Sequence, residues 1–365
     1  MFGSAQPIEQ VKVYVRDANS NTIIGQGITD DVGRFTINWS ATPTPAQAHL
    51  TWHAEHGHNR FAIRSGSGGT WVMWTPPFTL VPSGLVDIGS PQWGNELAPH
   101  PITNIYDGGQ KGWWDGLWWS SRLRIYFGGV EARFPSSACP TSCASCEFNL
   151  IHLDPGSAFS PQGRVMHELG HIATCRAHVG QSRWQGAPTD FDCPWCTDGW
   201  GLVQPEWYMA GFEEGLATFL GDVAFYGANA ASPTTCISGP SACPMVFSLE
   251  ASSGDSCSQL FIERRWPLST IRALWDVFDT RQDCPPGFAC DAISNLYDDM
   301  VEALHAFPAG RCEGCVHEGW TCPEIEEPGA CWVDEPDGRS IYDYASNWVI
   351  ANDSSIWSAL ESNCF

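Results

Sequence analysis

Three histidines and one glutamate lie within twelve residues in the stretch GRVMHELGHIATCRAHVG, residues 163–180. His167 and His171 enclose Glu168 in the pattern H-E-x-x-H. Residues four apart share one face of a helix, so both imidazoles can reach a single ion. Glu168 is displaced by about 100° around the helix axis and can reach a water on the metal without binding the metal. The pattern predicts hydrolysis assisted by Zn²⁺, which lowers the pKa of the water, with Glu168 as the general base.

His178 is a poor candidate for the third ligand. A metzincin pattern would place glycine and histidine where Thr174 and Ala177 stand. If the helix continues through IATCRA, His178 lies about 10 Å further along the axis than His171. A zinc–nitrogen bond spans only about 2.0–2.1 Å. We therefore expect His178 in the last helical turn, where a cationic group stabilises the helix dipole.

A carboxylate in the segment GFEEGLATFLGD, residues 211–222, is the preferred third ligand. The segment resembles the glutamate helix of gluzincins, zinc metallopeptidases in which a downstream glutamate completes the site. Mapping that pattern onto this chain implies Glu214 as the ligand, with Glu213 as the alternative. Glu214 shares a helix face with small residues that allow close approach to the first helix, where Gly170 would help. These small residues are Ala217, Thr218 and Gly221.

Two features depart from the gluzincin pattern. The interval from His171 to Glu214 is longer than in the best-known members, which predicts a bulging insertion around Cys193 and Cys196. The position four residues after the ligand holds Thr218, where some members have an aspartate that orients a zinc-binding histidine. The candidates for that orienting role are Asp222 and Asp276.

Other candidate site residues are less well defined by their spacing. Asp190 in APTDFD would give an aspzincin-like site, but the glycine-threonine-aspartate pattern of that group is absent. DEPDGRSIYD, residues 334–343, offers oxygen ligands for Ca²⁺ without the EF-hand spacing, so calcium is unsupported. No spacing singles out the group that stabilises the oxyanion. Suitable types are Tyr208, Tyr226, Tyr297, His305 and Arg272.

The sixteen cysteines all lie between Cys139 and Cys364. An even, high count predicts disulfides and an oxidising compartment, and hence a secreted, extracellular or cell-surface protein. The C-x-x-C pairs are too far apart for a zinc ribbon. The first ten residues, MFGSAQPIEQ, lack the basic and apolar regions of a signal peptide, so we expect a leader to have been removed.

The net charge of −23 argues against nucleic acid and anionic lipid as partners. No run of eighteen apolar residues is present, so the sequence predicts no membrane span. The predicted partner is a protein or peptide substrate. The tryptophan-rich segment GGQKGWWDGLWWSS, residues 108–121, or the N-terminal module could also contact carbohydrate or a cell surface; packing between domains is the alternative for the tryptophans. The sequence leaves the oligomeric state undefined.

Residues 1–90 are predicted to form an all-β sandwich. Alternating runs such as VKVYV (11–15) and HLTWHAEHGHNRFAIR (49–64) are separated by turn residues every eight to twelve positions. The segment T-D-D-x-G-R-F-T-I resembles the prealbumin-like or carboxypeptidase-regulatory-like modules of bacterial secreted proteins. The histidines of HAEHGH, residues 53–58, are interpreted as solvated edge residues because alternation separates them onto two faces.

Residues 91–365 are predicted to form a second domain, so the chain is multidomain: an all-β sandwich followed by an α+β, mainly helical, disulfide-stapled, zincin-like domain. The segment IRALWDVFDT (271–280) resembles the A-L-W-D-x-x-D helix of bacterial gluzincin-like secreted proteins. Strands are predicted over 122–129 and 148–154. Helices are predicted over 160–180, 206–227, 269–279, 291–307, 340–349 and 354–362.

The function expected from these patterns is a gluzincin-type zinc metallopeptidase, a hydrolase of extracellular proteins. His167, His171 and Glu214 would hold the zinc, and Glu168 would activate water. The alternative is a non-catalytic cell-surface binding or assembly protein built on a zincin-like scaffold. A zinc hydrolase with a non-peptide substrate is a further alternative. Retention of Glu168 favours an enzyme.

Overall fold

The computed structural model describes the strands of the N-terminal part, the helix that contains the H-E-x-x-H segment and two further helices. The described residues are 8–41, 44–81, 86–89, 102, 105–106, 108–109, 129–139, 142–145, 148–155, 161–177, 208–226, 230–235, 247–249 and 267–278. Several predicted features lie outside them. These are the tryptophan cluster, the strand over 122–128, His178, Asp190, Cys193, Cys196, Tyr297, His305, the calcium candidate at 334–343 and the helices over 291–307, 340–349 and 354–362.

Nine strands form one mixed sheet in the described part of the chain. Along its main path the strand order is β2-β1-β3-β4-β7-β9-β8, and β5 and β6 also pair with β3. The strands are β1 (Val11–Asp17), β2 (Ile23–Ile28), β3 (Gln47–His56), β4 (Phe61–Arg64), β5 (Val72–Trp74), β6 (Phe78–Thr79), β7 (Val130–Arg133), β8 (Cys143–Ser145) and β9 (Leu150–His152).

The alternating sequence of β1 places its valines in the core. Val11 and Val13 are fully buried, and the intervening Lys12 and Tyr14 are partly exposed on the other face. The neighbouring β3 runs antiparallel to β1, with Val13 opposite Trp52. The expected period of two therefore holds for β1, which confirms the strand predicted over 11–15. The alternating run over 49–64 forms two strands, β3 and β4.

The sheet continues past residue 90. β4 pairs in parallel with β7, with Phe61 opposite Val130, and β7 pairs in parallel with β9. Hydrogen-bonded strands therefore connect the N-terminal part to the strands that precede the H-E-x-x-H helix. The division of the chain into a sandwich over 1–90 and a second domain over 91–365 stays a prediction.

His56 corrects one sequence interpretation. It is 1 % exposed, so the prediction that the HAEHGH histidines are solvated edge residues is wrong for this residue. His56 has the same parity along β3 as Trp52 and Ala54, which point into the core. Burial lowers the pKa of His56 to about 4, and nearby Arg60 adds to the effect, so the imidazole is neutral at physiological pH.

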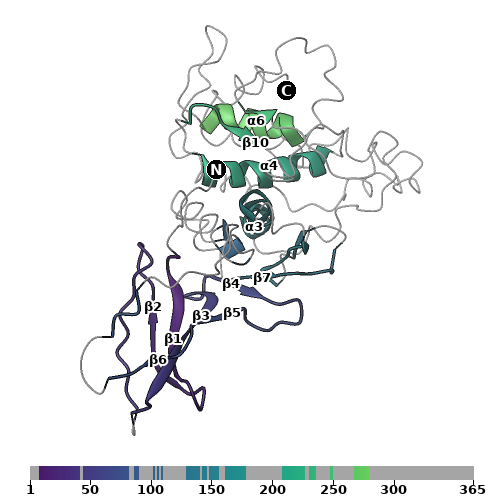
Figure 1. The fold of residues 1–365 in the computed structure, drawn as a ribbon. Coiled ribbons are helices and arrows are strands. Elements are labelled where there is room, and N and C mark those ends of the chain that lie inside the picture. Colours follow the sequence, from purple (N-terminus) through teal and green to yellow (C-terminus); the bar gives the residue numbers. More distant parts are fainter. Residues whose placement is uncertain are drawn as a thin grey trace, which may run out of the picture.

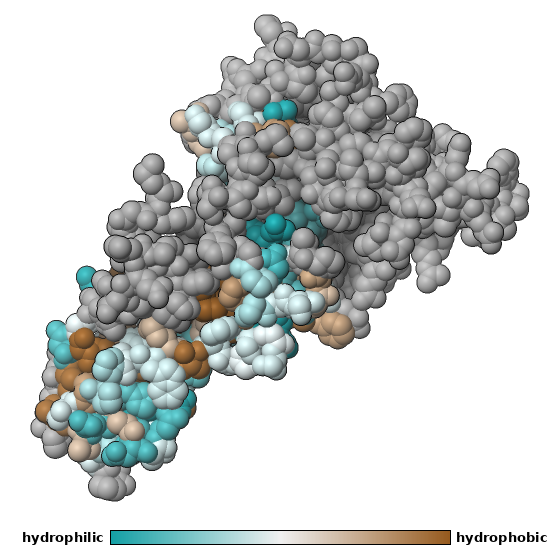
Figure 2. Space-filling model, turned by 45° about the vertical axis from the view of Figure 1, so that its right-hand side comes forward, coloured by the Kyte–Doolittle hydropathy of each residue, from teal (hydrophilic) through white to brown (hydrophobic). Residues whose placement is uncertain are grey.

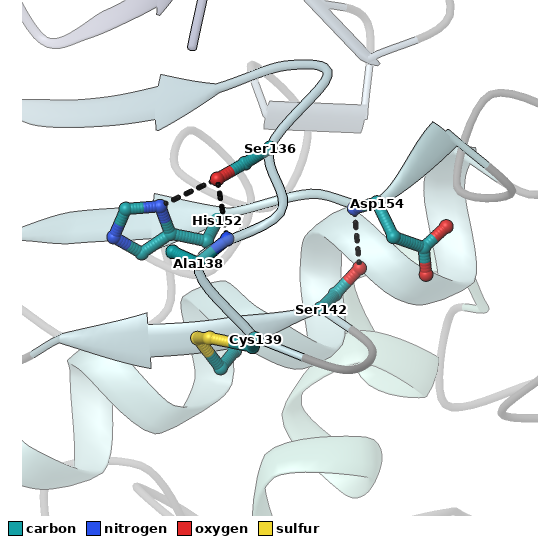
Figure 3. Close-up of a disulfide and its surroundings, with 7 residues drawn as sticks. Ser136, Ala138, Cys139, Ser142, His152 and Asp154 are labelled. Carbon is teal, nitrogen blue, oxygen red and sulfur yellow. Dashed lines mark hydrogen bonds between the residues drawn. A yellow bond between two sulfur atoms is a disulfide. The ribbon is translucent and has the colours of Figure 1, made fainter.

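One disulfide is present among the described residues, between Cys139 and Cys143 (Figure 3). It joins the loop after β7 to the first residue of β8. In the same region, the Ser136 hydroxyl lies 2.9 Å from Nδ1 of His152. Cys143 is thus bonded to Cys139 and is not a metal ligand paired with Cys146. This bond agrees with the prediction that the cysteines form disulfides.

Three helices are stacked in succession on one side of the sheet (Figure 1). They are α3 (Pro161–Ala177), α4 (Tyr208–Phe225) and α6 (Pro267–Phe278), and they confirm the helix predictions over 160–180, 206–227 and 269–279. Figure 1 shows α3 next to the sheet, α4 beyond it and α6 beyond α4. A two-stranded sheet of β10 (Thr234–Thr235) and β11 (Phe247–Ser248) accompanies them.

The apolar residues of α3 explain its position on the sheet. Val165, Leu169 and Ile172 recur at helical spacing, are nearly fully buried, and belong to the same core as the sheet residue Ile151. The other side of α3 is therefore free to face α4. This orientation turns His167 and His171 toward the second helix.

The described surface of the N-terminal strands mixes polar and apolar side chains (Figure 2). The exposed large apolar residues there are Ile23, Ile28, Val32, Trp74 and Val81. Within the part of the chain that the structure describes, no helix has both the length and the hydropathy to cross a bilayer.

Candidate metal centre

Three side chains from two helices converge at the contact between α3 and α4. His167 and His171 lie one turn apart on α3, and their Nε2 atoms are 3.1 Å from each other. Glu214 of α4 places Oε2 3.1 Å from Nε2 of His167 and Oε1 3.4 Å from Nε2 of His171. The structure thus brings together the three residues that the sequence predicted as metal ligands.

These separations match the edges of a small coordination tetrahedron. Four ligands at about 2.0–2.1 Å from a zinc ion lie about 3.3–3.4 Å from one another. The three observed separations are 3.1, 3.1 and 3.4 Å. Two imidazole nitrogens and a carboxylate oxygen are also donors that zinc accepts. The donor set and its spacing therefore fit a zinc ion with one position left for a further ligand.

Small residues allow the two helices to come this close. Gly170 lies against α4, where a Cβ would be only 2.4 Å from the carbonyl oxygen of Ala217. Gly221 lies against α3, where a Cβ would be 3.2 Å from the Cβ of Met166. The predicted role of the small residues on the Glu214 face is confirmed at these two contacts.

The three candidate ligands differ in exposure. The side chain of His167 is 7 % exposed, whereas the side chains of His171 and Glu214 are 21 % and 18 % exposed. The exposed surface of the cluster therefore belongs mainly to His171 and Glu214.

Glu214 and His171 shift each other's pKa. Burial by itself lowers the pKa of His171, but the Glu214 carboxylate outweighs it and raises that pKa to about 9. Burial by itself raises the pKa of Glu214, but the two histidines outweigh it and hold that pKa well below its ordinary value. In the absence of a metal, the pair carries a proton on His171 and a negative charge on Glu214 at neutral pH.

Glu168 lies beside this cluster, and its pKa is shifted in the opposite direction to that of Glu214. It is 3 % exposed. Burial raises its pKa above the ordinary value, and the two histidines offset only part of this effect. A raised pKa makes a carboxylate a stronger base. This property suits the predicted role of Glu168 as a general base.

Thr218 contacts His167, and the sequence did not single it out for this. Its hydroxyl lies 2.9 Å from Nδ1 of His167 and donates a hydrogen bond of 2.7 Å to the carbonyl oxygen of Glu214. The bond within α4 follows from helix geometry, because a helical threonine can bond the carbonyl four residues earlier. The contact with His167 depends on how the two helices pack. The sequence instead named Asp222 and Asp276. Asp222 lies near Thr235 of β10, and the side chain of Asp276 lies outside the described residues.

Other sequence candidates contact different partners. Arg272 donates from Nε to the carbonyl oxygen of Ser248 at 3.1 Å, which links α6 to β11. The hydroxyl of Tyr226 lies 3.1 Å from that of Thr234. Neither of these contacts involves the metal-site residues. The side chains of Glu213 and Tyr208 lie outside the described residues.

Comparison with known proteins gives no relative. The chain matches no protein-family model, no curated protein and no solved structure. The resemblances to gluzincins and to prealbumin-like modules stay expectations from short motifs. Function is therefore inferred from the geometry of the cluster.

Proposed function

We propose that this protein is a zinc-dependent peptidase. The observation that carries the proposal is the convergence of two imidazole nitrogens and one carboxylate at the spacing of a zinc coordination tetrahedron. A buried glutamate with a raised pKa lies next to the first histidine. The two helices that carry these residues pack closely through Gly170 and Gly221, which is not expected for side chains that meet by chance on the surface.

Each residue has a role in the proposed reaction. His167, His171 and Glu214 would hold the ion. Zinc in this position would lower the pKa of a water molecule and polarise the carbonyl of the substrate. Glu168 would accept a proton from the attacking water and pass it to the leaving amine, which its raised pKa favours.

One sequence feature supports a peptide substrate, and one structural feature supports an extracellular setting. The segment over 211–222 resembles the glutamate helix of metallopeptidases, and Glu214 from that segment lies beside the histidines. The Cys139–Cys143 bond supports an oxidising compartment. A non-catalytic binding protein on the same scaffold is the competing proposal, and it predicts bound zinc without turnover.

The test combines zinc content with cleavage of a quenched peptide library. Elemental analysis of the wild type should give one zinc per chain. Glu214→Ala should lose it, and Glu213→Ala, the same change one residue earlier, should keep it. Glu168→Gln should retain zinc and lose cleavage by a factor of about 10² or more.

The outcomes separate the alternatives. Zinc with no cleavage of any library member would favour the non-catalytic protein or a hydrolase of another substrate class. Loss of zinc in Glu213→Ala rather than in Glu214→Ala would show that Glu213 is the third ligand. A wild type without zinc affinity would overturn the proposal.

A further inference from the structure

We propose that Thr218 is a positioning residue that fixes the tautomer of His167 and anchors the Glu214 backbone. Thr218 stands four residues after Glu214, where some proteins with the gluzincin pattern have an aspartate. The inference rests on the proposed metal site, because its consequence is a lone pair directed at the ion. It assigns a specific role to a single hydroxyl group.

The number of protons in the hydrogen-bond chain decides the tautomer. A backbone carbonyl only accepts hydrogen bonds, so the 2.7 Å contact to the Glu214 carbonyl uses the single proton of the Thr218 hydroxyl. The same oxygen lies 2.9 Å from Nδ1 of His167 and has only lone pairs left to offer. Nδ1 must therefore carry a proton, and in the neutral ring Nε2 then carries the lone pair.

The lone pair then lies where a metal would need it. Nε2 of His167 faces both other ligands, at 3.1 Å from Nε2 of His171 and 3.1 Å from Oε2 of Glu214. In the opposite tautomer, a proton on Nε2 would occupy this space and block coordination. The Thr218 hydroxyl thus selects the form of His167 that can bind an ion.

The same hydroxyl connects ligands on two helices. His167 belongs to α3, whereas Thr218 and the carbonyl of Glu214 belong to α4. His167 and Thr218 are each 5 % exposed, so a water molecule has little room to replace the hydroxyl. Removal of the oxygen would leave Nδ1 of His167 buried without this partner and free the ring to change tautomer.

Metal affinity measured by competition with a chromophoric chelator tests the proposal. Thr218→Val keeps the shape of the side chain and removes the oxygen, and it should weaken binding about 10–100-fold. Thr218→Ser keeps the hydroxyl and should bind within a few-fold of the wild type. Thr270→Val makes the same change at a buried threonine of α6 and should leave the affinity unchanged.

The protonation of His167 in the metal-free wild type provides a second, independent readout. Selective ¹⁵N labelling of histidine should show that the neutral form of the His167 ring carries its proton on Nδ1. A neutral ring with its proton on Nε2, or an unchanged metal affinity in Thr218→Val, would overturn the proposal. If Thr218→Val does not fold, the serine variant and the labelled wild type still decide it.

These measurements distinguish the positioning role from the proposed function. A wild type that binds no metal would contradict the zinc site, whereas the tautomer measurement would still show whether Thr218 sets His167. A wild type that binds zinc without cleaving peptides would leave the Thr218 affinity test intact.

Discussion

Gly170 of α3 packs directly on the backbone of Ala217 in α4. A Cβ at Gly170 would lie 2.4 Å from the carbonyl oxygen and 2.7 Å from the Cα of Ala217. Both atoms belong to a helix backbone and cannot turn aside as a flexible side chain would. The distance between α3 and α4 therefore depends on the absence of a side chain at position 170.

Gly170→Ala is expected to push the helices apart and weaken metal binding. The overpacking should lower the free energy of unfolding by about 1–3 kcal/mol, even though alanine favours a helix more than glycine does. Gly221→Ala should have a smaller effect, since its Cβ would meet the Cβ of Met166 at 3.2 Å, where a small shift of the neighbour relieves the contact. Thermal unfolding and chelator competition would measure both effects. Equal, small effects in the two variants would contradict this view of the contact.

Metal binding at neutral pH should release about one proton. The pKa of His171 is raised from 6.5 to about 9 by Glu214, so its ring is protonated at pH 7 in the metal-free protein. Coordination requires the neutral ring. Calorimetric titration in buffers of different ionisation enthalpy counts the protons directly. Metal binding without proton release would show that His171 is already neutral.

The same shift gives the metal-free protein a pH-dependent stability. A histidine whose pKa is raised on folding contributes stability that is fully present below its unfolded pKa of 6.5. That contribution is lost as the pH rises through about 9. Denaturant unfolding of the metal-free protein should therefore show decreasing stability from this group between these values. Zinc-loaded protein should lack this dependence, since its ring carries no titrating proton.

Asp222→Asn is expected to stabilise the protein at neutral and alkaline pH. Oδ2 of Asp222 is buried without a hydrogen-bond partner among the described residues, and burial raises the pKa from 3.8 to about 8. Because the folded pKa is raised, ionisation of the unfolded chain removes stability progressively as the pH rises from 3.8 to about 8. The amide should recover on the order of 2 kcal/mol near pH 8. Urea unfolding at several pH values measures it.

Asp17→Asn is the control of opposite sign for that experiment. Hydrogen bonds from Ser20 and from the backbone of Asn19 lower the pKa of Asp17. Its contribution to stability is present above the unfolded pKa and is lost as the pH falls through the folded pKa. The asparagine variant should thus be less stable than the wild type at neutral pH. A stabilised Asp17→Asn would show that the pH dependence has another source.

Local patterns were sufficient to predict α3, α4 and α6 and the helix faces of the candidate site residues. His167 and His171 share a face of α3 because they are four residues apart, and Glu214 shares a face of α4 with Ala217 for a similar reason. The alternation in β1 likewise predicted which valines enter the core. These relations depend on the periodicity of one element, so a single segment of sequence contains them.

Contacts between segments that are distant in the sequence could not be predicted from these local patterns. The pairing of His167 with Thr218 spans 51 residues and depends on how α3 and α4 pack, which the spacing of either helix does not specify. Thr218 was seen only as a departure from a pattern. Similarly, the parallel pairing of β4 with β7 depends on strand neighbours that no local motif encodes.

The sequence by itself determined the chemical types: two imidazoles, a glutamate between them that we propose as general base, and a second helix with a carboxylate and small residues. Only the tertiary structure decided that Glu214 lies beside His171 and that one hydroxyl joins Glu214 to His167. The physical reason is range. Helical and strand periodicity act over a few residues, whereas the distance between ligands on two helices is set by side-chain packing at their contact.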